Sequence, residues 1–159
     1  TLPPGTGFRD DIESISTEVR RICEDLSPSV LENVGFIASL EFLLGHTIEN
    51  YMFDAGQTTD EQITFPVNVQ LQIYRIAQEV LTNIKRHSDA RLVEMLVSVA
   101  MPGSFDLTIV NDGKPFTPPE QLNQAGRGIA GIRSRASLIL ASVKWDKASD
   151  GRPRFRLSL

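Results

Sequence analysis

The sequence predicts one α+β domain of ordinary globular composition, with a short helical segment in front of it. Three observations support this fold class. Amphipathic helical spacing occurs in the first half of the chain and again near its end, short segments of the second half alternate apolar and polar residues, and the 159 residues are 41% hydrophobic and 23% charged. A chain of this length buries a core without disulfide bonds, which its single cysteine, Cys23, cannot form internally.

The charge balance argues against a general affinity for anions. The chain has 16 Lys and Arg against 20 Asp and Glu, a net charge of −4, so neither nucleic acid nor an acidic membrane is an expected partner. No apolar run reaches the roughly 18 to 20 residues of a membrane-spanning helix, and the first residues lack the features of a signal peptide. Any anion would have to be bound by a local site.

The first half of the chain is expected to be helical. One helix should run from 10 to 26 and end before Pro28, because the residue that precedes a proline disfavours the helical conformation. Its apolar stripe consists of Ile12, Ile15, Val19, Ile22 and Leu26. A second helix is expected from about 31 to 51, ending near Gly56, followed by a short extended stretch at 62–66.

The second half is expected to hold a long helix at 67–87, four strands and a further helix at 128–140. The strands are expected at 91–100, 104–111, 142–146 and 153–159. Their apolar faces consist of Val93, Met95, Val97, Val99, Phe105, Leu107, Ile109, Phe155, Leu157 and Leu159. Between the second strand and the last helix, the Pro- and Gly-rich segment 113–127 is either a binding loop or a surface insertion.

The helix at 67–87 presents an apolar face and a polar stripe that borders it. The apolar face consists of Val69, Ile73, Ile76, Val80 and Ile84, and the polar stripe of Arg75, Glu79, Asn83 and Arg86. Because Glu79 and Asn83 lie one turn apart, they offer a carboxylate and an amide oxygen, ligands that Mg²⁺ accepts beside phosphate oxygens and water. A merely solvated stripe is the alternative.

The two histidines and the cysteine give no support to other chemistries. His87 falls in the apolar arc of its helix and is expected to pack or to cap the helix end, and His46 has no acidic or nucleophilic neighbour in sequence. No zinc-like or triad-like spacing can be built from these three residues, so a metal hydrolase or a Cys or Ser nucleophile is not expected.

Two short glycine-containing segments could serve a phosphate site. Asn111-Asp112-Gly113 follows a strand, where a turn places polar groups at the rim of a sheet. Gly126-Arg127-Gly128-Ile129 precedes a helix, whose free amide groups favour an anion. A dinucleotide-binding fold is not supported, because a long loop and not a strand comes directly before these glycines.

Taken in order, these segments resemble the ATP-binding domain of sensor histidine kinases. The segments LQIYRIAQEVLTNIKRHSDA, LTIVNDGKPF and GRGIAGIRSRASLI read like the N, G1 and G2 boxes of the nitrate-sensor and DesK-like group, in the same order. The resemblance implies the Bergerat fold of the GHKL ATPases, a two-layer sandwich with a mixed sheet covered by helices on one face. It divides the chain into the end of a dimerisation helix at 1–27 and an ATPase domain at 28–159.

The resemblance also implies roles for individual residues in binding ATP and Mg²⁺. Glu79 takes the place of the acidic residue that polarises the attacking group, Asn83 would hold Mg²⁺, and Arg86 would lie near the phosphates. Asn111 stands where the family usually has an Asp that binds the adenine amino group, and Asp112 could share that task. The backbone of the glycine segments would contact the nucleotide, and the residues concerned are Gly113, Gly126, Arg127, Gly128 and Ile129.

This sequence departs from the family pattern at two positions. Asn111 keeps an acceptor oxygen but lacks the charge that strengthens such a hydrogen bond, and Pro115 replaces a glycine and removes a backbone donor at the start of the lid, 114–127. We expect weaker or altered nucleotide binding. The family's phosphoacceptor, a His followed by an acidic residue, does not occur, since Thr47 follows His46 and Ser88 follows His87.

The predicted function is therefore the ATP-binding catalytic half of a two-component sensor histidine kinase, with the acceptor His on a helix upstream of Thr1. A separate ATP-binding partner is the less favoured interpretation. The expected partners are a response regulator receiver domain and a second copy joined through upstream dimerisation helices. The domain would be cytoplasmic, with any membrane anchor of the parent upstream. The alternatives are a degenerate ATPase-like scaffold module and, less favoured because of the Leu26-Ser27-Pro28 hinge, an anti-sigma-type serine kinase.

Overall fold

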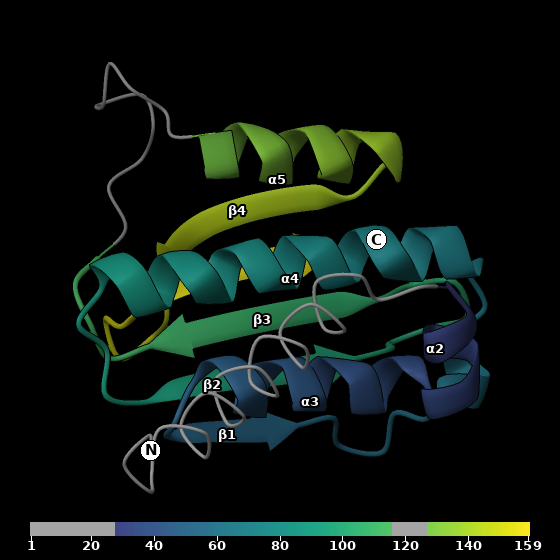
Figure 1. Cartoon of the computed structure of the whole chain (residues 1–159), viewed down its shortest axis with the longest axis horizontal. Helices are drawn as coiled ribbons and strands as arrows, with labels where there is room; N and C mark the ends of the chain where they lie inside the picture. The colour runs from purple at the N-terminus through teal and green to yellow at the C-terminus, as the bar shows by residue number, and fades with distance from the viewer. Residues whose placement is uncertain (1–27, 116–126) are drawn as a thin grey trace, which may run out of the picture.

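A computed structural model describes residues 28–115 and 127–159 of the chain. The predicted helix at 10–26 and most of the predicted lid lie outside these residues. The described part is an α+β fold with a five-stranded sheet (Figure 1). Its elements are α2 (Pro28–Val34), α3 (Phe36–Thr47), β1 (Tyr51–Asp54), η1 (Asp60–Gln62), α4 (Val67–His87), β2 (Val93–Ser98), β3 (Asp106–Asn111), α5 (Arg127–Leu138), β4 (Ser142–Lys147) and β5 (Pro153–Ser158).

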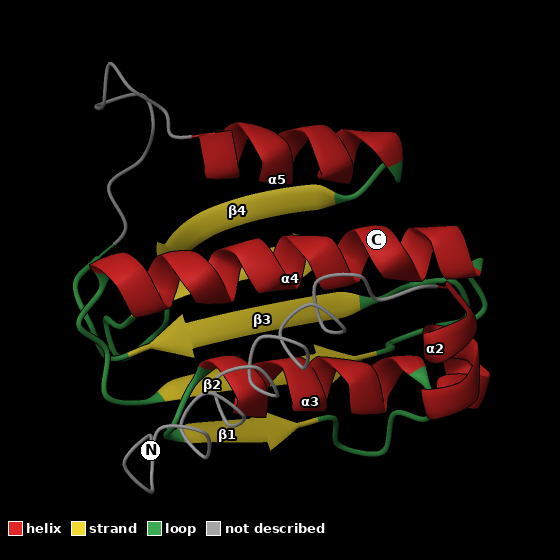
Figure 2. Ribbon diagram, viewed as in Figure 1, coloured by secondary structure: helices red, strands yellow, loops and turns green. Residues whose placement is uncertain are grey.

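The sheet is mixed, and its strands follow the order β1-β2-β3-β5-β4. The edge strand β1 pairs with β2 in parallel, and all other pairs are antiparallel. The three long helices lie side by side on one face of the sheet, with α4 between α3 and α5 (Figure 2). This confirms the predicted two-layer arrangement with a mixed sheet covered on one face.

The core lies between the helices and the covered face of the sheet. Met95, Leu107 and Ile109 are fully buried, as the alternation of their strands predicts. The three phenylalanines Phe36, Phe65 and Phe105 pack with ring centroids 5.5 to 5.9 Å apart. This aromatic cluster joins the start of α3 to the segment before α4 and to the segment before β3.

Helix α4 has the predicted bounds and a wider buried surface than its predicted apolar face. Ile73, Ile76 and Val80 are buried as expected, whereas Val69 and Ile84 are only half-buried. Three further residues, Tyr74, Ala77 and Leu81, are fully buried. Because α4 lies between two other helices above the sheet, one apolar stripe cannot account for all of its contacts.

The second predicted helix is wrong in two respects, and the first is a break at Gly35. This glycine has a φ of 95°, which a helix does not allow, and it separates α2 from α3. Asp60 fixes the break, because its Oδ1 accepts hydrogen bonds from the N–H groups of Phe36 and Ile37 at 2.9 and 3.1 Å. A Cβ at Gly35 would approach Asp60 Oδ2 to 2.6 Å, so this position requires glycine.

The second error concerns the end of that predicted helix, where residues 51–54 form the strand β1. Helix α3 ends at Thr47, and Ile48 already has an extended conformation. Strand β1 pairs with β2 from Tyr51 opposite Val93 to Asp54 opposite Leu96. Its apolar residues support a helix or a strand equally well over so few positions, and the parallel pairing decides for the strand.

The uncovered face of the sheet carries a row of paired charges. Asp146 contacts Arg154 at 2.7 Å and Arg156 at 2.6 Å. Arg152 contacts Glu94 at 2.9 Å. The pairs of Asp146 join the neighbouring strands β4 and β5, and the pair of Arg152 connects the turn before β5 to β2, on a face that no described helix covers.

Candidate functional site

Two of the predicted site residues, Glu79 and Gly128, are brought together where α4 passes the start of α5. Both are half-buried, and a Cβ built on Gly128 would collide with Oε1 of Glu79 and lie 3.0 Å from its Cδ. The glycine therefore leaves the space that the Glu79 carboxylate occupies. Further along the two helices, the Arg135 guanidinium donates a hydrogen bond to Oε1 of Gln72 at 2.9 Å and holds them together.

Asn83 and Arg86 continue the polar stripe toward the end of α4. Asn83 is half-buried and Arg86 is exposed. No hydrogen bond or ion pair joins the side chains of Glu79 or Asn83 to another residue within 28–115 and 127–159. A half-buried carboxylate and amide without a protein partner are available to an external ligand.

Asn111 lies at the end of β3 on the helix-covered side of the sheet. It is buried with 6% exposure. Because it lies two and four positions after Ile109 and Leu107, its side chain is on the same face of the strand as these core residues. Its Oδ1 accepts a hydrogen bond from the N–H of Gly113 at 2.9 Å, which closes a tight turn after the strand. The strand therefore ends in a buried polar side chain beneath the helices.

Gly113 brings this turn against the end of α4. A Cβ on Gly113 would collide with the carbonyl oxygen of Ser88 and lie 2.9 Å from the amide nitrogen of Ala90. The N–H of Lys114 donates to the same Ser88 oxygen at 2.7 Å. The end of β3 and the C-terminal turn of α4 are thus joined backbone to backbone.

Sequence reasoning missed Ser88, which organises this junction. Its hydroxyl donates to the carbonyl of Ile84 at 2.7 Å and accepts from the N–H of Ala90 at 3.2 Å. It is buried with 6% exposure at the C-cap of α4. The sequence contained a signal for this helix end in Asp89, the residue after Ser88. Asp is a residue type that tolerates the left-handed conformation, and Asp89 adopts it with a φ of 53°.

Asp112 points away from Asn111, as adjacent residues at a strand end do. Its Oδ1 accepts hydrogen bonds from the N–H groups of Arg91 and Leu92 at 2.7 and 2.9 Å. The bonds from Leu92 and Arg91 hold the pKa of the Asp112 carboxyl below its ordinary value. The structure therefore gives Asp112 the task of joining the turn after β3 to the turn before β2.

The second glycine segment is described only in part. Gly126 lies outside the described residues, Arg127 begins α5, and Ile129 is buried with 8% exposure. Ile129 anchors the first turn of α5 and so fixes the position of Gly128 beside Glu79. Of the predicted lid, the structure describes Lys114 and Pro115 at one end and Arg127 at the other.

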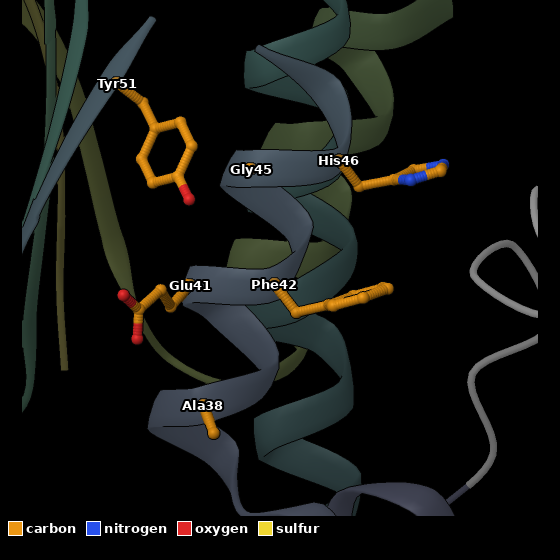
Figure 3. Close-up of a pocket in the computed structure, with 6 residues that line it drawn as sticks. All are labelled: Ala38, Glu41, Phe42, Gly45, His46 and Tyr51. Atoms are coloured by element: carbon orange, nitrogen blue, oxygen red, sulfur yellow. The ribbon is translucent and has the colours of Figure 1, made fainter. Parts of the chain in front are cut away.

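Neither histidine takes part in a binding arrangement among the described residues. His87 is exposed at the end of α4, so of its two expected roles, packing in the core or capping the helix end, the first was wrong. His46 is exposed on α3 and stacks on Phe42 with ring centroids 5.9 Å apart. Phe42 and His46 line an open hollow together with Ala38, Glu41, Gly45 and Tyr51 (Figure 3). This hollow lies by the edge strand β1, whereas α5 contacts the opposite edge strand, β4.

The donor set suits a hard cation held jointly with a ligand. Within the described ranges, no three His, Cys, Asp or Glu side chains gather into a metal site. Glu79 and Asn83 supply two oxygen donors, which is the number of protein ligands Mg²⁺ commonly takes when phosphate and water complete its shell. The residues present therefore fit a Mg²⁺–phosphate group.

No described helix is both long and apolar enough to cross a membrane.

Comparison with known sequences identifies histidine kinases as relatives, although no protein-family model matches the chain. The histidine-protein kinase/phosphatase DegS of Brevibacillus brevis is 27% identical over 91% of this chain and 37% of its own length. The sensor histidine kinase MctS of Rhizobium johnstonii is 33% identical over 74% of this chain and 25% of its own length. The chain thus spans little more than a third of these relatives at most.

Solved structures of histidine kinases share the fold. The blue-light activated histidine kinase of Erythrobacter litoralis EL346 superimposes with a TM-score of 0.68 at 17% identity, covering 100% of this chain and 51% of that one. Full-length ShkA in complex with AMPPNP gives a TM-score of 0.57 at 13% identity, covering 78% of this chain and 29% of that one. The chain therefore has the fold of histidine kinase catalytic domains, and its sequence relatives are histidine kinases.

Proposed function

We propose that this chain is the ATP-binding catalytic part of a two-component sensor histidine kinase of the nitrate-sensor and DesK-like group. One observation carries the proposal: the Glu79 carboxylate lies against Gly128 at the start of α5, and the turn at Gly113 is joined to the end of the same helix α4. Two segments far apart in sequence, the start of α5 and the turn after β3, are thereby brought against α4. The ATPase domain would comprise residues 28–159, and residues 1–27 would be the end of the dimerisation helix.

The start of α5 at Gly128 is suited to a phosphate-bearing ligand. Gly128 has no side chain that could fill the space beside Glu79, and α5 starts one residue earlier, at Arg127. The first amide groups of a helix have no partner within it and favour an anion. The nucleotide phosphates would lie at this helix start, with the exposed Arg86 supplying positive charge. Full-length ShkA, part of which has the same fold, forms a complex with AMPPNP, an ATP analogue.

Asn83 would hold Mg²⁺ together with the phosphates. When bound, the ion neutralises the charge of the phosphate oxygens. Glu79 would have the catalytic task, because its carboxylate can accept a hydrogen bond from an N–H of the attacking imidazole and raise electron density on the other nitrogen. That nitrogen bonds to the γ-phosphorus while the bond to the bridging oxygen of ADP breaks. Positioning and charge neutralisation supply most of the acceleration in such transfers.

The acceptor imidazole would come from a dimerisation helix upstream of this sequence, since neither His46 nor His87 is followed by an acidic residue. The phosphoryl group would then pass to an Asp of a response regulator receiver domain. A homodimer formed through the upstream helices would bring the acceptor within reach. In this assembly the domain described here would be cytoplasmic.

Nucleotide binding is the first test. Calorimetric titration of the folded chain with Mg·ATP and Mg·ADP should give saturable binding at or below millimolar nucleotide. No binding in that range by a sample whose circular dichroism shows it to be folded would refute the proposal. Binding without any phosphoryl transfer in the second test would favour the alternative, a scaffold module that retains the fold but not the turnover.

Phosphoryl transfer is the second test and needs the parent protein with its upstream histidine. Glu79→Gln should retain Mg·ATP binding within about threefold and lower phosphohistidine formation about 100-fold or more, the range expected for a lost general base. Glu41→Gln is the matched control, because Glu41 is an exposed glutamate on α3 beside the hollow at β1. Unchanged labelling in Glu79→Gln would show that Glu79 has another role.

A further inference from the structure

Charge is distributed unevenly between the two edges of the sheet. The chain from α2 to η1, which includes the edge strand β1 (28–66), has six Asp and Glu and no Lys or Arg. The chain from α5 to the end, which includes the edge strand β4 (127–159), has eight Lys and Arg against two Asp. Because β1 and β4 are opposite edge strands, the domain has an acidic edge and a basic edge (Figure 1). The net charge of −4 conceals this separation.

On the basic edge, Leu140 has a backbone conformation that is unfavourable for a leucine. It follows the end of α5 with a φ of 58°, in the left-handed region where glycine is preferred and a bulky side chain is strained. The N–H of Ala141 donates to the carbonyl of Ala136 at 2.9 Å, and the N–H of Leu140 to that of Ser137 at 3.2 Å, the pattern of a helix end that usually has glycine. The leucine side chain is 91% exposed, so core packing does not explain its presence.

Further apolar side chains are exposed at the same end of the sheet. Leu138 is 74% exposed two positions before Leu140, and we call these two residues the apolar tip. Met101 is exposed in the turn between β2 and β3. The two turns lie at one end of the sheet, because the end of β2, the start of β3 and the start of β4 fall in one register row. The candidate nucleotide site lies at the other end, where β3 finishes at Asn111.

The side chains around the apolar tip give it a positive charge. No Asp or Glu occurs between positions 121 and 145. The exposed basic side chains next to the tip on α5 and β4 are Arg133, Arg135 and Lys144. The two arginines contact neutral groups, the Trp145 ring and the Gln72 amide, and so keep their charge. Of the carboxylates that follow in the sheet, Asp146 is already neutralised by two arginines, and Asp106 lies two strands away from β4.

We propose that the apolar tip and its basic surroundings are a docking site for an anionic phospholipid membrane. Leu138 and Leu140 enter the headgroup layer, and the cationic side chains beside them contact the phosphates of the lipids. A projecting tip enters a bilayer without a preformed groove, whereas a folded acidic protein would need a groove of matching shape. The acidic edge is repelled by the same surface, so the domain docks in one orientation. In that orientation the candidate nucleotide site, at the other end of the sheet, remains accessible.

Sedimentation with unilamellar vesicles tests the docking site in the unaltered chain. Vesicles of phosphatidylcholine with about 30% phosphatidylglycerol should bind the chain saturably at or below about millimolar lipid. Vesicles of phosphatidylcholine alone should bind it at least about tenfold more weakly, because the cationic side chains then have no net negative charge to meet. Equal binding to the two kinds of vesicle would overturn the proposal.

Leu140→Gly distinguishes docking from stability. The urea midpoint should rise because glycine relieves the strain, while the affinity for anionic vesicles should fall at least about fivefold because the inserted side chain is lost. Met52→Ala is the matched control, since Met52 is an exposed apolar residue at the acidic edge, and it should leave vesicle binding unchanged. Vesicle binding that Leu140→Gly leaves intact, or that falls only together with a lower urea midpoint, would overturn the proposal.

Lys144→Gln tests the contribution of charge without altering the tip. It should weaken binding to anionic vesicles about fivefold, the effect of one basic residue near such a surface. Lys85→Gln, the same change on an exposed lysine near the end of α4, should have no effect. Failure of a folded sample to bind either kind of vesicle would overturn the proposal in favour of an acidic protein partner for the tip. None of these measurements uses a nucleotide, so each of these failures would leave the proposed function standing.

Discussion

The two faces of the sheet use charge in opposite ways. On the uncovered face, Asp146 lies between Arg154 and Arg156 at 2.7 and 2.6 Å, and Arg152 holds Glu94 at 2.9 Å. On the helix-covered face, Glu79 is half-buried with no hydrogen bond or ion pair to another described residue. Charges that neutralise one another stabilise the strands they connect, whereas a half-buried charge without a partner among the described residues is available to a ligand.

The difference extends to what holds each face in place. Side chains connect the strands on the uncovered face, but the candidate site is fixed by close backbone contacts at Gly113 and by a glycine at 128. We therefore expect substitutions to act differently on the two sides. On the site side the cost should come from added atoms, and on the uncovered face from lost charges.

The largest expected effect on stability is that of Gly113→Ala. Its Cβ would collide with the Ser88 carbonyl oxygen and lie 2.9 Å from the Ala90 amide nitrogen, and both are backbone atoms that cannot rotate away. We expect a loss of about 2 to 4 kcal/mol in the free energy of unfolding, at or above the usual range for overpacking. Urea denaturation followed by circular dichroism measures it.

Gly131→Ala is the matched control for this prediction. Gly131 lies inside α5, and a Cβ there would meet no atom within 4 Å. The variant should be unchanged or more stable by up to about 1 kcal/mol, because alanine is the better helix former. Equal losses in the two variants would show that the close approach at Gly113 does not determine stability.

The uncovered face is tested by Asp146→Asn. Hydrogen bonds from Arg154 and Arg156 lower the pKa of Asp146 from its ordinary 3.8 to about 2. With its side chain 19% exposed, the interaction should contribute about 1 to 2 kcal/mol to stability after solvent screening. Asp146→Asn should remove that contribution at pH 7.

The pH dependence gives the sign of this effect. Because the pKa is lower in the folded chain than in the unfolded one, the stabilisation is complete above about pH 4 and is lost as the pH falls toward about 2. The difference in unfolding free energy between the unaltered chain and Asp146→Asn should therefore shrink across this interval. A difference that stays constant from pH 7 to pH 2 would contradict the assigned role of the carboxylate.

The elements that the sequence predicts well are those whose pattern is long or repeated. Helix α4 has 21 residues with a persistent helical period, and its bounds agree with the prediction, as do the alternating strands β2, β3 and β5 within a few residues. Strand β1 has only four residues, and its identity depends on pairing with β2. The paired residues Tyr51 and Val93 are 42 positions apart in the sequence (93 − 51). Such a pairing leaves no local pattern.

The same distinction applies to the candidate site. Glu79 and Gly128 were predicted from motif order, and the structure places them in contact. The structural role of Asp112 could not be predicted, since its partners are backbone groups 20 and 21 positions away in the turn before β2. The orientation of the Asn111 amide likewise depends on a backbone N–H whose position only the folded turn determines.

Gly128→Ala should affect stability less than Asp146→Asn, although its Cβ would also collide with a neighbour. The neighbour here is the end of the flexible Glu79 side chain, which can rotate away, and alanine favours the helix. We expect the unfolding free energy to change by less than about 1 kcal/mol. Mg·ATP binding should weaken about tenfold, because Glu79 and the start of α5 are displaced. Unaltered binding would show that the contact between Glu79 and the start of α5 is not part of the nucleotide site.

The smallest expected effect is that of Lys114→Ala, which removes an ion pair on the site side. Lys114 and Asp89 are in contact at 2.5 Å, but their side chains are 71% and 76% exposed, and exposed pairs contribute little to stability. The urea midpoint should not move, because the backbone bond from Lys114 to Ser88 remains. The pKa of Asp89, which the hydrogen bond from Lys114 lowers, should rise toward its ordinary value in an NMR titration. A drop in the midpoint as large as that of Asp146→Asn would mean that paired charges stabilise both faces alike.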